Sequence, residues 1–115
     1  MHEYSIVASL IDRVEREATM YEGARVHKLH VSIGKLAGVE LDLLSVAFET
    51  FRDRTVCEDA ELSIRTVEPI WTCPECERRL LRGAILRCES CDRPARMTQG
   101  DEIILERIEM EAPHV

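Results

Sequence analysis

The chain has 115 residues, of which 45% are hydrophobic and only 4% aromatic, and its net charge is −7. This length suits one small domain with room for an appendage, and the hydrophobic share argues against intrinsic disorder. The negative charge repels phosphate backbones, and no apolar run is long enough to span a bilayer, so we expect no nucleic-acid partner and no membrane span.

The N-terminal stretch predicts an amphipathic helix over about residues 4–20. Its apolar residues recur at helical spacing, with charged residues between them: Ile6, Val7, Leu10, Ile11, Val14 and Ala18. Glu3 and Asp12 stand where a secretory signal would need a basic region followed by an unbroken apolar stretch. The sequence therefore predicts a cytoplasmic protein.

A strand, a second helix and another strand are predicted next. Residues 25–34 alternate polar and apolar side chains, as a strand with one buried face does. The stripe of the second helix consists of Val39, Leu43, Leu44, Ala47, Phe48 and Phe51. Both phenylalanines are expected in the core. Residues 61–67 alternate again, and the order strand–helix–strand favours a right-handed crossover between two strands of one sheet.

Residues 70–99 differ from the rest, because they hold four of the five cysteines and show little periodicity. Strand character resumes over residues 101–110. We therefore expect an α+β fold in which two helices pack on a small mixed three-stranded sheet. Residues 1–69 and 100–115 would form this domain, and residues 70–99 would form an inserted zinc-ribbon-like domain.

The insert contains two C-x2-C pairs, Cys73 with Cys76 and Cys88 with Cys91, separated by eleven residues. Two such pairs bring four thiolates within reach of one tetrahedral ion, and closed S4 coordination leaves no position for a substrate. An odd number of cysteines in a reducing cytosol argues against a disulfide framework. The pattern predicts structural Zn(II), with iron in a rubredoxin-like site as a less favoured alternative.

The chain begins Met1-His2-Glu3, which offers a second set of ligands. The terminal amine, the amide nitrogens of His2 and Glu3 and the His2 imidazole can form a planar set of four nitrogens. Square-planar nitrogen coordination is characteristic of Ni(II) or Cu(II) rather than Zn(II). A histidine at position 2 is by itself a weak signal, because it is most often an ordinary solvated residue.

The remaining single residues favour structural roles. His27 and His30 lie three apart on the first predicted strand, which predicts that they point to opposite faces. Cys57 has no partner at metal-binding spacing and is expected to be a small buried side chain near the end of the second helix. The sequence has no nucleophile elbow, glycine-rich phosphate loop or HExxH helix, so we expect no enzyme.

Taken together, MHEYS at the start, AFETF in the second helix, the paired C-x2-C motifs and TQGDEI before the last strand resemble the HypA/HybF family of hydrogenase nickel-incorporation proteins. The resemblance covers essentially the whole chain. It implies Ni(II) binding by Met1 through its amine, His2 through imidazole and amide, and Glu3 through amide or carboxylate. It assigns Zn(II) to Cys73, Cys76, Cys88 and Cys91.

The resemblance further implies a nickel metallochaperone that serves [NiFe]-hydrogenase maturation. Its implied partners are a HypB-type GTPase and the precursor of the hydrogenase large subunit. The alternative is a zinc-ribbon adaptor that binds other proteins and has no nickel role. The sequence leaves open whether urease is also served, and whether the chain is a monomer or a weak homodimer.

Overall fold

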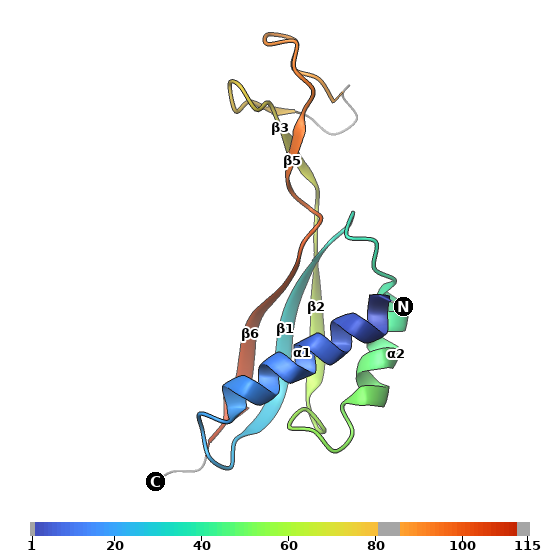
Figure 1. Cartoon of the computed structure of the whole chain (residues 1–115), viewed down its shortest axis with the longest axis vertical. Coiled ribbons are helices and arrows are strands. Elements are labelled where there is room, and N and C mark those ends of the chain that lie inside the picture. Colours follow the sequence, from blue (N-terminus) through green and yellow to red (C-terminus); the bar gives the residue numbers. More distant parts are fainter. Residues whose placement is uncertain (1, 81–85, 113–115) are drawn as a thin grey trace.

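The computed structural model describes residues 2–80 and 86–112, except for the side chain of His2. The described residues form two helices and six strands (Figure 1): α1 His2–Ala18, β1 Arg25–Gly34, α2 Leu41–Phe51, β2 Glu61–Val67, β3 Ile70–Thr72, β4 Arg79–Leu80, β5 Arg96–Gln99 and β6 Ile103–Glu111. Neither of these helices is both long enough and apolar enough to cross a membrane.

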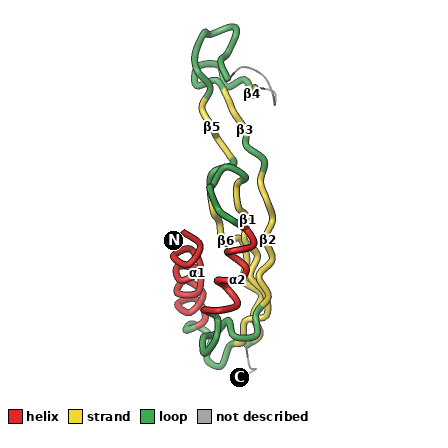
Figure 2. Tube along the Cα trace, turned by 90° about the vertical axis from the view of Figure 1, so that its right-hand side faces the viewer, coloured by secondary structure: helices red, strands yellow, loops and turns green. Residues whose placement is uncertain are grey.

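The main sheet has the strand order β2-β1-β6 and is mixed, as predicted. β1 runs parallel to β2 and antiparallel to β6. The parallel pair is joined through α2, which confirms the predicted strand–helix–strand unit. Both helices lie on the same face of this sheet (Figure 2). The predicted α+β fold class is therefore confirmed.

The core lies between that face and the two helices. α1 contributes residues at helical spacing, and β1 contributes its inward-facing residues. The members of this cluster with the lowest exposure are Val7, Val14, Val26, Leu29, Val31, Ile33, Leu44, Ala47, Phe48, Cys57 and Ala60. Burial of these side chains, rather than local propensity alone, is what stabilises the two helices against the sheet.

Two expectations for α2 are wrong. Leu43 is 50% exposed and Phe51 is 45% exposed, whereas Phe48 is buried as predicted. The sheet and α1 cover only the narrower stripe formed by Leu44, Ala47 and Phe48. Leu43 flanks that stripe, and Phe51 lies in line with it at the last residue of α2. The core therefore covers neither the full apolar width of the helix nor its C-terminal end.

The predicted opposite orientation of His27 and His30 is also wrong. The pairing of β1 with β6 is irregular between Val26 and Lys28, so Val26 and Leu29 both point into the core although they are three residues apart. The two imidazoles consequently share the outer face, where His27 contacts Glu111 at 3.1 Å and His30 contacts Glu109. A β-bulge inserts one residue and shifts the alternation of side chains in this way.

A second, distal sheet of order β4-β3-β5 projects from one end of the main sheet (Figure 1). The radius of gyration is therefore 18.3 Å, against about 13 Å for a compact chain of this length. The two connecting segments meet the end of β1 at Gly34, Gly100 and Pro69. A Cβ at Gly34 would overlap the Gly100 carbonyl, and one at Gly100 would overlap Pro69. We call this crossing the neck.

Candidate metal sites

The sulfur atoms of Cys73, Cys76, Cys88 and Cys91 all lie within 4.8 Å of one another. The Sγ atoms of Cys76 and Cys88 are 3.8 Å apart. A tetrahedral zinc ion with bonds of about 2.3 Å requires sulfur–sulfur separations of about 3.8 Å. The two pairs, which eleven residues separate in the sequence, thus form a cluster with the donor set and size of a structural zinc site.

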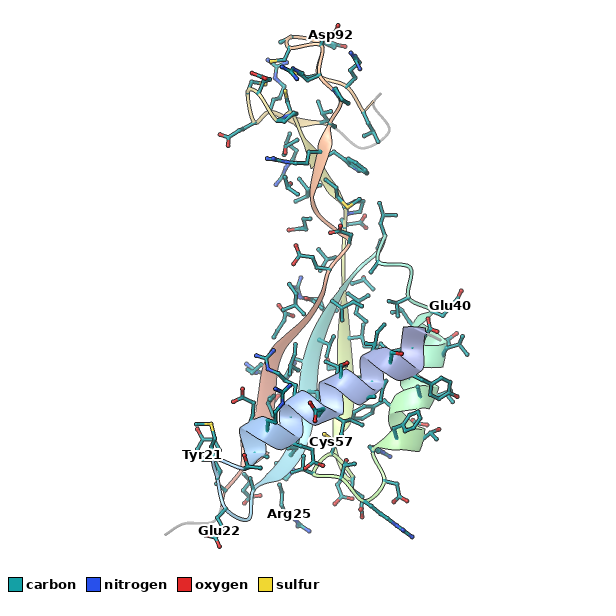
Figure 3. All side chains as sticks on the ribbon, in the orientation of Figure 1. Tyr21, Glu22, Arg25, Glu40, Cys57 and Asp92 are labelled. Atoms are coloured by element: carbon teal, nitrogen blue, oxygen red, sulfur yellow. The ribbon has the colours of Figure 1, made fainter. Side chains whose placement is uncertain are left out.

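Each cysteine pair is held by the same backbone turn. The Glu77 N–H donates to the Cys73 carbonyl at 2.9 Å, and the Asp92 N–H donates to the Cys88 carbonyl at 2.8 Å. Glu77 and Asp92 have positive φ angles of 60° and 51°, although neither is glycine. This backbone conformation is costly for such residues and persists only where its surroundings hold it. Figure 3 shows Asp92 at the far tip of the distal part.

The sulfur atoms of the cluster differ strongly in acidity. Hydrogen bonds from the Cys76 and Glu75 backbone N–H groups lower the pKa of Cys73 to about 7. Hydrogen bonding to Cys76, together with burial and the neighbouring sulfur atoms, raises the pKa of Cys91 to about 12. Four adjacent sulfur atoms cannot all ionise without a cation, so metal binding at this cluster releases protons.

Two arginines close in sequence to the cysteines pair with carboxylates. Arg87 Nε donates to Asp92 Oδ1 at 2.7 Å, and Arg93 pairs with Glu75 at 3.0 Å. The Arg87 guanidinium also lowers the pKa of Asp92. The Arg93–Glu75 pair therefore connects the two cysteine turns, and the Arg87–Asp92 pair lies within the second turn.

The structure describes only part of the predicted N-terminal ligand set. Met1 and the His2 side chain lie outside the described residues. Glu3 is only 7% exposed, and its Oε2 accepts a hydrogen bond of 3.1 Å from the Glu40 backbone N–H. Figure 3 places Glu40 beside the start of α1. Glu3 is thus fixed to the start of α2.

α1 begins at His2, two residues earlier than predicted. The first four N–H groups of an α-helix have no acceptor within the helix itself. The amide nitrogens at positions 2 and 3 belong to this set, so a metal bound there would break no bond of the helical ladder. The geometry is compatible with the expected amide ligands.

Cys57 lies apart from the cluster, under α1 (Figure 3), and is fully buried. Burial and the charge of Glu15 raise its pKa to about 11. This confirms the prediction of a small buried side chain.

The sequence reasoning missed the link between Glu3 and Glu40. Glu40 is the N-cap of α2 and makes no capping bond through its own side chain. The only local signal was an acidic residue close to the chain start, and that signal does not identify a partner 37 residues away.

Comparisons with known proteins agree with this geometry. Residues 1–110 match the family model described as "Hydrogenase/urease nickel incorporation, metallochaperone, hypA". The hydrogenase maturation factor HypA of Wolinella succinogenes is 38% identical over 115 residues, covering 97% of each chain. That of Shewanella baltica (strain OS185) is 33% identical over 113 residues, covering 96% of this chain and 97% of its own.

Two solved structures are also similar. The solution structure of a HypA protein gives a TM-score of 0.82 at 35% identity, with 98% of each chain covered. The solution structure of the Ni metallochaperone HypA from Helicobacter pylori gives 0.74 at 34% identity, covering 96% of this chain and 98% of its own. The overall fold of this chain is therefore shared with both.

Proposed function

Because this chain belongs to the HypA family of nickel-incorporation metallochaperones, we propose that it binds one Ni(II) at its N-terminus and delivers the ion during maturation of [NiFe]-hydrogenase. The observation that carries the proposal is the family match from residue 1 to residue 110, which includes both the first three residues and the four cysteines. Hydrogenase is favoured over urease because the similar curated proteins are named hydrogenase maturation factors.

Nickel is the cargo of this protein, and we propose that nitrogen atoms hold it. The ligands are the Met1 amine, the His2 imidazole and amide, and the Glu3 amide. Four nitrogens in a plane suit Ni(II) and disfavour Zn(II). The Glu3 carboxylate has a different part in this proposal, because it already accepts a hydrogen bond from Glu40 and so anchors the terminus.

The four cysteines hold structural Zn(II) in this proposal. Their sulfur atoms form a closed tetrahedral donor set, so the ion leaves no position for cargo. We propose that residues 70–99 fold as a zinc-dependent unit inserted into the domain formed by residues 1–69 and 100–115. The second sheet, which the described residues build from β3, β4 and β5, supports this division.

We propose that the protein acts in the cytoplasm and that it is a nickel carrier rather than an enzyme. It receives or passes nickel through contact with a HypB-type GTPase and with the precursor of the hydrogenase large subunit. The family membership supports a place in hydrogenase maturation, and the two named partners are the finer proposal.

A Ni(II) titration of zinc-loaded, untagged protein tests the ligand set. Two variants are compared with it, one extended by a residue ahead of Met1 and the other His2→Ala. We expect one tightly bound Ni(II) in the native protein and loss of that site in both variants, while the zinc content stays unchanged. Equal nickel binding by all three proteins would favour the zinc-ribbon adaptor over the nickel carrier.

A further inference from the structure

Four large apolar side chains are exposed together where α1 begins beside α2. They are Tyr4, at 38% exposure, and Leu43, Val46 and Phe51, at 50%, 54% and 45%. The Tyr4 and Phe51 rings meet edge to face, with centroids 5.2 Å apart. Leu43 and Val46 are separated by one helical turn and share one side of α2. We call these four residues the helix-pair surface.

The helix-pair surface lies beside Glu3, the one proposed nickel ligand whose side chain the structure describes. Glu3, which precedes Tyr4, is bonded to the residue that caps α2. In Figure 1 the start of α1 crosses directly beside α2. A protein that covered this surface would therefore stand next to the N-terminus.

The surface is made of helices, and this restricts what can cover it. The backbone groups of a helix interior are already bonded within the helix, so a strand cannot add to it as it would to a sheet edge. A ridge of side chains such as Leu43 and Val46 packs instead into the groove of another helix. Along the axis of α2, Leu43 and Phe51 are about 12 Å apart, the length of roughly two helical turns.

Acidic residues border the apolar side chains. Asp42 and Glu49 are exposed and stand seven positions apart on α2, on the side next to Val46. A second copy of this chain would bring the same carboxylates towards its own, and like charges repel at close range. Basic residues on a partner would instead find opposite charges at the border of the contact.

We propose that the helix-pair surface docks an amphipathic α-helix of a partner protein, whose apolar face is flanked by lysine or arginine. This inference extends the proposed function. It rests on that function only in assuming that the partner exchanges the nickel ion bound at the N-terminus. Docking beside the terminus places the partner's own ligands close to the cargo during exchange.

A labelled helical peptide with a leucine stripe flanked by lysines is the probe, and the same peptide with glutamates in place of the lysines is its control. Fluorescence anisotropy gives the affinity, and amide shifts of isotope-labelled protein give the location. We expect the lysine peptide to shift the amides of residues 4–8 and 41–51, and the glutamate peptide to bind at least about tenfold more weakly.

Three variants test the surface. Leu43→Ser/Val46→Ser should lower the affinity for the lysine peptide about tenfold or more. Ile104→Ser removes an apolar side chain of 46% exposure from β6 and should leave that affinity unchanged. Asp42→Lys/Glu49→Lys should bind the glutamate peptide more tightly than the lysine peptide. Unfolding of the variant could not produce such a reversal of affinities. Nickel titration of the serine variant should still give one site, so that failure of docking and failure of nickel binding are seen separately.

Equal peptide binding by the native protein and the serine variant would overturn the proposal. Amide shifts centred on the outer face of the main sheet would do the same. So would a concentration-dependent dimer, seen by sedimentation velocity, that the serine substitutions abolish, because the surface would then belong to a second copy of this chain.

Discussion

The buried Glu3 carboxylate accepts a hydrogen bond of 3.1 Å from the backbone N–H of Glu40, and so connects the first turn of α1 to the residue before α2. A carboxylate at a helix N-terminus is favoured by the helix dipole. The bond therefore serves two purposes, because it completes the start of α2 and holds the first turn of α1 beside it.

Substitutions of Glu3 separate an anchoring role of this carboxylate from a ligand role. Glu3→Ala leaves a part-buried N–H without this acceptor, which costs about 1–2 kcal/mol in the free energy of unfolding. Glu3→Gln keeps a carbonyl oxygen in the same place and should cost less. We expect Glu3→Ala to weaken nickel binding by loosening the terminus, and Glu3→Gln to bind nearly as the native protein does. Urea unfolding and nickel titration measure both effects, and an equal loss of affinity in the two variants would identify the carboxylate as a ligand.

Much of this architecture follows from local patterns in the sequence. The spacing of Val7, Leu10 and Val14 predicts α1, and alternation over β1 predicts the buried face of the sheet. The paired C-x2-C motifs predict a cluster because each motif alone positions two sulfur atoms. These features depend on neighbours in the chain, so a single sequence suffices to find them.

The features that the sequence did not reveal depend on contacts between distant segments. The bulge next to His27 arises from the register between β1 and β6. The exposure of Leu43 and Phe51 depends on how much of α2 is covered by α1. Glu3 meets Glu40, 37 residues away, because both helices pack on the same face of the sheet. No periodicity within one element contains this information.

The neck should be intolerant of any side chain at Gly34. A Cβ there would overlap the Gly100 carbonyl and would lie 2.6 Å from the Asp101 nitrogen, so backbone would have to move. We expect Gly34→Ala to lower the free energy of unfolding by about 3 kcal/mol or more. Gly38→Ala is the matched control, because a Cβ at Gly38 meets nothing within 4 Å and costs only about 1 kcal/mol through the positive φ angle. Similar denaturation midpoints for the two variants would contradict this account of the neck.

Loss of one zinc ligand should unfold the distal part and leave the main sheet folded. Among the described residues of this part, Cys73 and Cys88 are the buried apolar ones, so metal binding must supply most of its folding free energy, about 10–16 kcal/mol in zinc-binding peptides. We expect Cys73→Ser to remove amide protection from β3 and β5 but not from β1. Hydrogen exchange measures this directly, and Cys57→Ser serves as the control that leaves the cluster intact. Protection of β3 that survives in Cys73→Ser would disprove the dependence on metal.

The five cysteines should react with a thiol reagent in two distinct groups. Chelation of zinc should expose four thiols to rapid labelling at pH 7.5, while Cys57 stays unlabelled because it is fully buried and its pKa is raised to about 11. The thiolate is the reactive form, so both burial and protonation slow the reaction. We expect the fifth thiol to react only after addition of denaturant, and Cys57→Ala to abolish that late phase alone. Rapid reaction of five thiols on chelation would show that Cys57 is accessible in the folded chain.

Lowering the pH should reduce the stability of the protein by protonating two glutamates of β6 on the outer face of the main sheet. The Arg65 guanidinium, which donates to Glu106 at 2.9 and 3.2 Å, lowers the pKa of Glu106, and hydrogen bonds from His30 and Arg107 lower the pKa of Glu109. A depressed pKa means that the folded state prefers the ionised group. Its contribution to stability is therefore present above the unfolded value of about 4.3 and is lost as the pH falls through the folded value.

Glu106→Gln removes this contribution at every pH, so the variant should be less stable than the native protein at pH 6 and equally stable near pH 3. Urea unfolding at both pH values measures the difference, and acid release of zinc affects both proteins alike. Added salt should shrink the gap at pH 6, because the pair is exposed and therefore screened. Glu102→Gln is the control, since the described residues offer Glu102 no ion pair and its removal should not change the acid dependence. A gap between Glu106→Gln and native protein that is the same at pH 3 and pH 6 would mean that the Arg65–Glu106 pair acts through packing rather than charge.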